Sequence, residues 1–526
     1  MRNQWNLDSY SRTIYRTTSI LIINDVGFES GVVVPVPAVH SFPNSRPDMA
    51  LPFAEETTRA RAAQAGWARL SVRARLKPVR AFRRKLVDAP EELLAAIEAD
   101  VHRPASEVLG TDFLSTAAAA KYLESYAYWI LYPKIIVGRP LWLFGVSTRQ
   151  VAMPHGVVGL IGTWNYPLFL NAVPILHALV AGNALLWKPS EQAPQMAAVL
   201  HRLLLESGFP PDLLQMLPAT REAGPDLVEA DIDFLHFTGS DTVGRKLAAR
   251  LGARLIPSTM ELSGVDAALV LADADLDLAA KTVLYGATLN NGQTCIATRR
   301  AFVHKAVYPA FAEKLKALVA KTNPVELQTP GQVSQMERLI ADAVARGGIA
   351  FPEPAGRCQP TVILNGSTEM AVCREASFAP LVAVIPCDSF DDMVRRANDC
   401  AFGLSSSVFS AATRSIPELR VGSMVFNDTI VPTAHPATPF GGRGASGWGS
   451  TQGREGLLAM TYPKVTSRRV LPIRQHIDAG LARDPALGDA LMGTLRFNYG
   501  RGLRQRWRGL LQMIGGFRRM GQKPIR

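Results

Sequence analysis

The spacing of hydrophobic residues changes near residue 155 and divides the chain into two kinds of pattern. From Ala54 to about Leu131, apolar residues recur every three or four positions, as in EELLAAIEADV, which predicts consecutive helices. After residue 156, short apolar runs alternate with helical segments. The runs VVGLI, NALLWK, LLQML, DFLHF and RLIPSTMEL predict strands, and helices are expected from about Leu168, over QMAAVLHRLLLE and from Val243. This alternation predicts an α/β fold with a parallel sheet that helices cover on both faces.

Both ends of the chain depart from these patterns. Residues 1–48 contain Pro35, Pro37 and Pro43 and keep no lasting period, so we expect a loosely ordered leader. Residues 476–526 form a basic C-terminal tail. In its last part apolar residues recur every three or four positions while most arginines fall on other faces, which predicts an amphipathic helix. The apolar residues of this helix are Leu503, Trp507, Leu510, Leu511, Ile514 and Phe517.

The tail helix has two interpretations. Its arginines and Trp507 suit peripheral contact with an anionic membrane surface, on the inner face of a membrane. In the alternative, the apolar stripe packs on the protein's own body or across a dimer, and Gly515 and Gly516 end the helix early.

Composition limits the class of protein. The chain has 526 residues, of which 48% are apolar and 19% charged, so a multi-domain globular protein is expected. The formal net charge is +12, but residues 501–526 hold eight Arg and Lys and no Asp or Glu. The basicity therefore belongs to the tail, and we expect no nucleic-acid partner. The five cysteines show no paired spacing, and no signal peptide or membrane span is evident, which predicts free thiols and a cytoplasmic location.

Polar residues follow several predicted strands, at the edge where parallel α/β sheets bind ligands. GTWNYP presents Trp164 and Asn165, although an asparagine here is also an ordinary turn residue. WKPSEQAP places Lys188 and Glu191 three positions apart, and the alternative is a proline-initiated helix that Ser190 caps.

The next predicted strands lead into a glycine-rich turn and a carboxylate. TGSDTVG opens a helix whose free N–H groups can meet a pyrophosphate, although Gly239 and Gly244 do not form the common G-x-G-x-x-G fingerprint. MELSG places Glu261 at a strand end, where a solvated carboxylate is the alternative. Downstream, NNGQTC places Cys295 in a small, polar, glycine-containing setting, in which we expect an exposed and ionisable thiol.

Together these groups suit the oxidation of an aldehyde. A thiolate adds to the carbonyl, an amide and a backbone N–H hold the oxyanion, a hydride leaves for a nicotinamide, and a carboxylate activates the water that cleaves the thioester. No His, Cys or acidic cluster has metal-ligand spacing, so no metal is expected. Cys358, Cys373, Cys387 and Cys400 are interpreted as structural, and His155 as a strand-entry residue.

Between about residues 50 and 475 the chain resembles the NAD(P)-dependent aldehyde dehydrogenases. NNGQTC is similar to the family's nucleophile motif, MELSG to its Glu-Leu-Gly-Gly motif, and PFGGRGASGWG to its late glycine-rich segment. The resemblance implies that Cys295 is the catalytic thiol, Glu261 the base and Asn165 the oxyanion donor. It also implies that NAD, or alternatively NADP, is bound by a larger set of residues. These are Ile161, Thr163, Trp164, Lys188, Ser190, Glu191, Gly239, Ser240, Val243, Gly244, Leu262 and Phe378.

Within that set, the similarity of WKPSE places Lys188 and Glu191 at the adenosine ribose. The similarity of FTGSDTVG places Gly239, Ser240 and Gly244 at the pyrophosphate. NAD is favoured, because a carboxylate at Glu191 accepts from a ribose 2′-hydroxyl and repels a 2′-phosphate.

The resemblance implies an aldehyde dehydrogenase-like α/β fold, with a Rossmann-type cofactor domain over 49–133 and 154–262 and an α/β catalytic domain over 263–440. A small β arm for oligomerisation would comprise 134–153 and 455–475, and a homodimer is expected. Likeness to the class 3 branch, in GTWNYP and NDTIVPTAHPATPFGG, implies an apolar aldehyde, either fatty, aromatic or polyene. The aldehyde would be oxidised to the acid through a Cys thiohemiacetal and thioester. The alternative is a catalytically altered or silent relative that binds a membrane or a partner.

Two departures from the family pattern concern the cofactor. EASFAP keeps Phe378, but Ala376 stands where the family has a ribose-binding Glu. Glu375 lies one position early and would point to the other face of an extended segment. ELSG contains Ser263, whose hydroxymethyl group would lie close to the nicotinamide.

Overall fold

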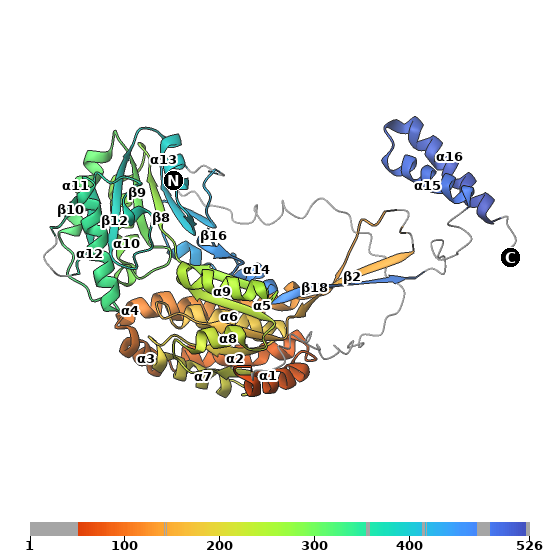
Figure 1. Ribbon diagram of the computed structural model, residues 1–526, viewed down its shortest axis with the longest axis horizontal. Helices are drawn as coiled ribbons and strands as arrows, with labels where there is room; N and C mark the ends of the chain where they lie inside the picture. The colour runs from red at the N-terminus through yellow and green to blue at the C-terminus, as the bar shows by residue number, and fades with distance from the viewer. Residues whose placement is uncertain are drawn as a thin grey trace, which may run out of the picture. The chain divides into compact units, whose positions relative to one another are not determined.

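The computed structural model describes residues 51–140, 143, 145–353, 358–412, 416, 418–470 and 484–521 (Figure 1). The predicted leader lies outside these residues. The described residues form two large β-sheets with covering helices, a three-stranded sheet and a C-terminal helical hairpin. The α/β fold class predicted from the sequence is thereby confirmed.

Helices fill the N-terminal region of helical spacing. Ser71 caps the second of them by accepting a hydrogen bond from the Ala74 N–H. The first helix is tied to a later helix, α6 (Phe169–Ala181), because the Trp67 indole N–H donates to the Leu179 carbonyl at 2.7 Å. The helices are α1 (Ala54–Trp67), α2 (Val72–Asp88), α3 (Glu91–Val101), α4 (Ala105–Val108), the π-helix η1 (Leu109–Phe113) and α5 (Leu114–Ile130).

The first large sheet has the strand order β17-β7-β6-β3-β4-β5, and all its strands except β17 run parallel. The chain passes from β3 to β4 and β5 on one side and then to β6 and β7 on the other, so the strand order reverses between β3 and β6. Open α/β sheets bind ligands at such a reversal. The strands are β3 (Val157–Ile161), β4 (Ala184–Lys188), β5 (Leu214–Met216), β6 (Phe234–Gly239), β7 (Ser258–Leu262) and β17 (Gly447–Trp448).

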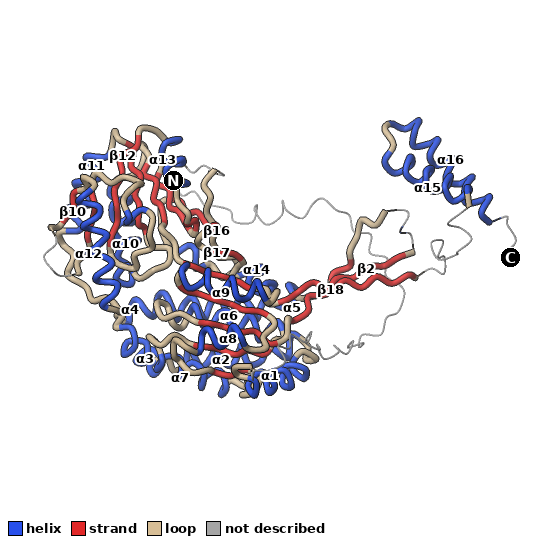
Figure 2. Tube along the Cα trace, in the orientation of Figure 1, coloured by secondary structure: helices blue, strands red, loops and turns tan. Residues whose placement is uncertain are grey.

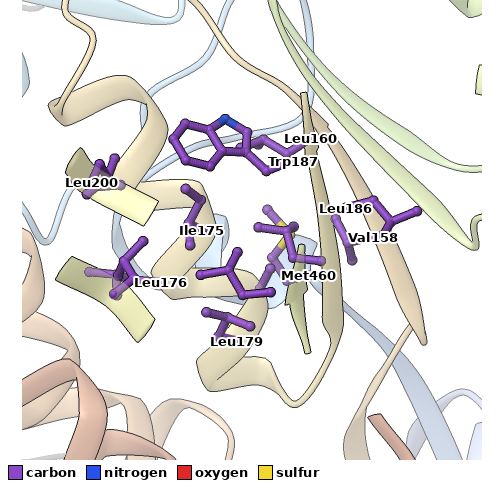
Figure 3. Packing of buried hydrophobic residues seen from close by; sticks show 14 of the residues in the cluster. Val158, Leu160, Ile175, Leu176, Leu179, Leu186, Trp187, Leu200 and Met460 are labelled. Atoms are coloured by element: carbon purple, nitrogen blue, oxygen red, sulfur yellow. The ribbon is translucent and has the colours of Figure 1, made fainter. Parts of the chain in front are cut away.

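Helices and an apolar core cover this sheet. Figure 3 shows the packing around the fully buried Trp187 of β4, whose neighbours include Leu160 of β3 and Ile175. The Trp187 indole N–H is not left unpaired, because it donates to the Asn171 Oδ1 at 3.1 Å. The helices are α6 (Phe169–Ala181), α7 (Pro194–Glu206), α8 (Ala223–Glu229), α9 (Asp241–Ala253) and α14 (Gly453–Ala459).

The second large sheet has the order β10-β11-β12-β9-β8-β14-β15, parallel except for β10. Two separate apolar clusters pack on it. The strands are β8 (Asp266–Val270), β9 (Thr298–His304), β10 (Ile349–Phe351), β11 (Thr361–Leu364), β12 (Leu381–Cys387), β14 (Ser405–Phe409) and β15 (Ser423–Phe426). The helices are α10 (Leu276–Thr288), α11 (Tyr308–Val319), α12 (Pro330–Ala345) and α13 (Phe390–Asn398), and a short ribbon pairs β13 (Phe402–Gly403) with β16 (Arg443–Gly444).

A three-stranded antiparallel sheet joins segments that lie far apart in the sequence. It has the order β1-β2-β18, formed by Lys134–Ile135, Val146–Pro154 and Thr461–Arg469 (Figure 2). The register of β2 and β18 is unbroken from Thr461 opposite Pro154 to Arg469 opposite Val146. Most side chains of β18 are exposed, so this sheet is not stabilised by a core of its own.

The described part of the tail is a hairpin of α15 (Pro485–Tyr499) and α16 (Gly502–Gly521). The expectation that Gly515 and Gly516 end the helix early is wrong, because α16 continues through both. Gly516 instead allows close packing, since a Cβ there would lie 2.5 Å from the Ala490 backbone nitrogen of α15. No helix among the described residues is both long and apolar enough to cross a membrane.

Candidate active site

Three loops bring Asn165, Glu261 and Cys295 together. Asn165 follows β3, Glu261 lies near the end of β7, and Cys295 follows the 3-10 helix η3 (Leu289–Gly292). Because β3 and β7 lie on either side of β6 and run parallel, their carboxyl ends meet at one edge of the sheet. The segment of Cys295 reaches this edge from the second large sheet, immediately before β9.

The backbone before Cys295 explains the sequence NNG. Asn290, Asn291 and Gly292 all have positive φ, of 52°, 54° and 75°. Asparagine tolerates this region better than most residues. Gly292 is also required for space, because a Cβ there would lie 2.4 Å from the Ala379 carbonyl carbon. These successive left-handed residues turn the chain sharply, so that Cys295 faces the first sheet.

Cys295 is less exposed than expected. The residue is half-buried, and its Sγ lies 3.9 Å from the Glu261 Oε1. Burial, together with the nearby carboxylates of Glu261 and Asp266, raises the pKa of the Cys295 thiol well above its ordinary value. The prediction of an exposed, readily ionised thiol is therefore wrong for this state. Loop composition could not reveal the two carboxylates, which come from other strands.

Glu261 is a buried carboxylate, so the alternative of a solvated one is wrong. Only 3% of the residue is exposed, and its Oε2 has no hydrogen-bond partner among the described residues. Burial raises the pKa of Glu261 to about 7. The short strand β17 covers it by pairing Gly447 with Glu261. Glu261 is thus poised to exchange a proton near neutral pH.

Asn165 is held by hydrogen bonds on both ends of its amide. Its Nδ2 donates to the Gln293 carbonyl at 3.0 Å, and its Oδ1 accepts from the Thr163 hydroxyl at 3.1 Å. The Asn165 carbonyl accepts from the Asn290 amide at 2.7 Å. An amide nitrogen carries two hydrogens, so Nδ2 keeps one donor for a ligand while the other secures the loop of Cys295.

Two buried charged residues that sequence reasoning missed support this geometry. Arg103, 2% exposed, pairs with Asp112 at 2.7 Å and also donates to the Asn165 carbonyl at 3.2 Å. Asp112 in turn accepts from the Leu168 N–H at 3.2 Å, and so fixes the start of α6. The only local signal was an Arg and an Asp nine apart in a helical region, a spacing without functional meaning by itself.

A narrow apolar cavity of about 110 Å³ leads to Cys295 and Glu261. Ile430 in its wall has a φ of 55°, which is unusual for a β-branched residue and marks a constrained loop. Besides Cys295, Glu261 and Ile430, the lining residues are Gly110, Thr111, Ser115, Tyr166, Phe169, Leu170, Leu289, Thr294, Ile296, Val431, Thr433, Ala434, Phe440 and Gln452. None of these carries a cation.

The residues expected at an adenosine ribose form an ion-pair cluster. Lys188 ends β4 and lies 3.1 Å from the Glu191 Oε2, while Arg221 lies 3.0 Å from the Glu191 Oε1. Ser190 accepts from the Gln192 N–H in a turn, and α7 begins only at Pro194. The alternative in which Ser190 caps a helix is therefore wrong.

The residues expected at a pyrophosphate lie where β6 ends and α9 begins. Ser240 caps α9 by accepting from the Val243 N–H at 3.3 Å. Gly244 brings the helix close to β7, because a Cβ there would lie 2.6 Å from a Leu262 methyl carbon. Gly239 is the last residue of β6 and directly precedes the cap residue Ser240. The first turn of α9 thus offers unpaired N–H groups beside the strand reversal, which fits a phosphate.

The remaining expected cofactor residues lie at the end of β3 and in the segment of Phe378. The rings of Trp164 and Phe378 lie 6.2 Å apart, and Thr163 and Ile161 lead into Trp164 from β3. These aromatic faces, the turn of α9 and the cluster at Glu191 together fit a dinucleotide.

The departures at Ala376 and Ser263 have distinct environments. The Ala376 carbonyl accepts from the Gln335 amide at 3.1 Å, while Glu375 pairs with Arg338 on α12 and is exposed. Ser263 is buried, and its carbonyl accepts from the Ser446 hydroxyl at 2.9 Å.

The other residues singled out from the sequence lie outside the site. Cys358, Cys373, Cys387 and Cys400 are free thiols, as Cys295 in the site is. His155 precedes β3, where its Nε2 lies 3.1 Å from the Ala459 carbonyl oxygen and its ring stacks on Phe234. Within the described ranges, no group of three or more His, Cys, Asp or Glu is placed to hold a metal ion.

Known proteins share this architecture. Residues 53–466 match the model of the Aldehyde dehydrogenase family. The chain is 32% identical over 448 residues to the 4,4′-diapolycopene aldehyde oxidase of Methylomonas sp, covering 82% of this chain and 84% of that protein. Among solved structures, it is similar to a Mycobacterium tuberculosis aldehyde dehydrogenase complexed with NAD+, with a TM-score of 0.73 and 28% identity over 79% of this chain and 89% of that one. An aldehyde dehydrogenase from Brucella melitensis biovar abortus 2308 matches with a TM-score of 0.74 and 26% identity, over the same shares of the two chains.

Proposed function

The chain belongs to the aldehyde dehydrogenase family and is an NAD(P)-dependent aldehyde dehydrogenase, and we propose that Cys295, Glu261 and Asn165 oxidise an apolar aldehyde to its carboxylic acid. The observation that carries this assignment is the 3.9 Å separation of the Cys295 Sγ and the Glu261 Oε1 at the end of an apolar cavity.

The reaction begins with a proton transfer inside this pair. Because the pKa of Glu261 is raised to about 7, its carboxylate accepts the thiol proton of Cys295 as the aldehyde arrives. The thiolate adds to the carbonyl carbon, and the free hydrogen of the Asn165 amide stabilises the oxyanion of the thiohemiacetal.

Oxidation and hydrolysis complete the reaction. Bound NAD(P)+ supplies the acceptor for the hydride, and the two-electron oxidation leaves a thioester on Cys295. Glu261 passes the proton it took from Cys295 to solvent, and then takes a proton from a water molecule as that water attacks the thioester. The C–S bond then breaks, the carboxylic acid leaves, and Glu261 returns the proton to the Cys295 sulfur, which regenerates the thiol. The free Oε2 of Glu261 is the atom available to the water, since Oε1 faces the sulfur.

The lining of the cavity supports an apolar substrate. Apolar side chains dominate it, and no Arg or Lys among its residues could pair with a substrate carboxylate. NADH formation with straight-chain aldehydes of increasing length tests this proposal, and kcat/KM should rise with chain length. Succinate semialdehyde is the matched control, because its carboxylate would be buried without a partner; a preference for it would overturn the proposal.

For the cofactor we propose the set expected from the sequence, Lys188 and Glu191 at the ribose and the start of α9 at the pyrophosphate. Their support is the position of both groups beside the strand reversal between β3 and β6. NAD is the favoured cofactor. NADP is the alternative, since the cation of Arg221 lies beside Glu191.

We propose domain boundaries that follow the sheets. A cofactor domain over 49–133 and 154–262 contains the first large sheet except β17, and a catalytic domain over 263–440 contains the second. The arm over 134–153 and 455–475 contains the three-stranded sheet except Pro154, the last residue of β2. Residues 141, 142, 144 and 471–475 of the arm lie outside the described residues. This exposed sheet supports a homodimer, because a partner subunit would cover it.

The C-terminal hairpin supports contact with a membrane surface. Its helices meet through glycines, so that large apolar side chains remain outside. In α16, Leu503, Trp507 and Leu511 are exposed along one face, while Leu491 and Leu495 are exposed on α15. Residues 484–521 also carry seven arginines and two aspartates. This combination suits an anionic lipid surface, and we propose a cytoplasmic enzyme whose hairpin binds the inner face of a membrane.

A further inference from the structure

Arg221 lies in the loop between β5 and α8 and pairs with Glu191. Its Nε is 3.0 Å from the Glu191 Oε1, while the Lys188 Nζ is 3.1 Å from the Oε2. Each carboxylate oxygen of Glu191 therefore holds one cation. Sequence reasoning did not single out Arg221, because it lies thirty residues after Glu191 and on another loop.

The side chains of Lys188 and Arg221 differ in how freely they can move. The Lys188 side chain is 6% exposed and has little space to move, whereas the Arg221 side chain is 77% exposed. Glu191 with both cations carries a net charge of +1. Although partial burial favours its neutral form, a backbone hydrogen bond and the two cations lower the pKa of Glu191, so the carboxylate is charged at neutral pH.

We propose that Arg221 determines cofactor specificity by allowing the adenosine site to accept a 2′-phosphate as well as a 2′-hydroxyl. This inference rests on the proposed placement of the ribose at Lys188 and Glu191. With a hydroxyl, Glu191 accepts its hydrogen bond and both ion pairs stay in place. With a phosphate, the exposed guanidinium of Arg221 leaves Glu191 and donates two N–H groups to the phosphate oxygens. Lys188 remains paired with Glu191 and offsets the repulsion between the Glu191 carboxylate and the phosphate.

Calorimetric titration of the full chain with 5′-AMP and with adenosine 2′,5′-bisphosphate tests the proposal without turnover. These probes differ only in the 2′-phosphate. For an exposed arginine, Arg221→Ala should weaken binding of the bisphosphate by about fivefold or more, and binding of 5′-AMP by less than about twofold. Arg250→Ala is the matched control, because Arg250 is another exposed arginine that forms an ion pair, at the far end of α9. If Arg221→Ala and Arg250→Ala weaken the binding of each nucleotide to the same extent, Arg221 has no specific role.

Glu191→Gln separates failure of this inference from failure of the ribose assignment. Removing the carboxylate should weaken the binding of 5′-AMP, because its 2′-hydroxyl loses an acceptor. It should strengthen the binding of the bisphosphate, because the 2′-phosphate is no longer repelled by a carboxylate and Arg221 is released from its ion pair. If Glu191→Gln leaves both dissociation constants unchanged, the ribose does not lie at Glu191. If Glu191→Gln acts as expected but Arg221→Ala does not lower the preference for the bisphosphate, only the role of Arg221 is overturned.

Discussion

At the scale of single residues, the pair of Cys295 and Glu261 decides the chemistry. The thiol is half-buried and its pKa is raised, so it is not a reactive thiolate before substrate binds. Its reactivity then depends on Glu261 as proton acceptor. This arrangement protects the sulfur from oxidation in the resting enzyme, since the thiolate is the form that oxidants attack.

Cys295→Ala should lower the rate of NADH formation at least about a thousandfold, because the covalent pathway is lost. The fold should persist, as the backbone contacts of this loop, such as the Gly264 N–H donating to the Cys295 carbonyl at 3.0 Å, do not involve the sulfur. Stopped-flow absorbance measures the rate of NADH formation, and circular dichroism measures whether the fold persists. Cys358→Ala removes a half-buried thiol elsewhere and serves as control; near wild-type turnover by Cys295→Ala would contradict the nucleophile assignment.

Glu261→Gln should slow both acylation and hydrolysis, but hydrolysis much more, so that an acyl-enzyme accumulates. The Cys295 thiol can still lose its proton to solvent, whereas water is a far weaker acid and needs the base. Intact-mass spectrometry after addition of aldehyde and NAD+ should then show the acyl adduct on Cys295. In the wild type, the rate of deacylation should fall about tenfold per pH unit below pH 7, since a carboxyl with a pKa of about 7 is protonated there and cannot act as a base.

The variant should lack this pH dependence. Glu375→Gln neutralises an exposed carboxylate that pairs with Arg338 and is the matched control. Rapid turnover of Glu261→Gln with no adduct, or an unchanged pH profile, would show that another group activates the water.

At the scale of elements, the arm strand β18 pairs along one edge and has no strand partner along the other among the described residues. It pairs with β2 on one side and is the end strand of its sheet. Pro463 has no N–H, so its nitrogen faces away from β2, and Val465, two residues on, presents its N–H to the same open side. Val465 is 59% exposed, so its side chain is not part of a core.

Val465→Pro should therefore weaken the homodimer while leaving the pairing of β2 and β18 in place, provided that a partner strand binds this edge. Light scattering coupled to size exclusion measures the mass. Val465→Ala removes the side chain but keeps the N–H, and it should remain dimeric. A Val465→Pro protein that stays dimeric at low micromolar concentration would place the interface elsewhere.

At the scale of the whole molecule, the C-terminal hairpin should attach the enzyme to membranes. Full-length protein should float with vesicles rich in anionic lipid at low salt and less so at high salt, because screening weakens the contribution of the arginines. A chain ending at Val470 should remain unbound. If the full-length and the shortened chain float to the same extent, the hairpin does not bind membranes and instead packs against protein.

A full-length double variant, Trp507→Ala with Leu511→Ala, tests the same surface without truncation. It should lose most vesicle binding while its aldehyde turnover stays at the wild-type rate, since both side chains are exposed on α16. Unchanged flotation would show that the apolar face does not contact lipid.

The sequence determined the features that depend on neighbours along the chain. The alternation of strands and helices, the small, polar and glycine-containing setting of Cys295 and the glycine-rich turn that opens α9 all follow from local pattern and residue chemistry. The resemblance of its motifs identified the family. Local reasoning placed the start of α6 within one residue and missed the continuation of α16, because the glycines that break an isolated helix also permit close packing against α15.

Only the tertiary structure decided the electrostatics of the site. Burial of Glu261 beneath β17, its approach to Cys295 and the ion pair of Arg103 with Asp112 join segments that lie from nine to nearly two hundred residues apart. The approach of Arg221 to Glu191 is of the same kind. A charge acts on whatever lies within a few ångströms and depends on how much water remains, and neither quantity is encoded by spacing along the chain.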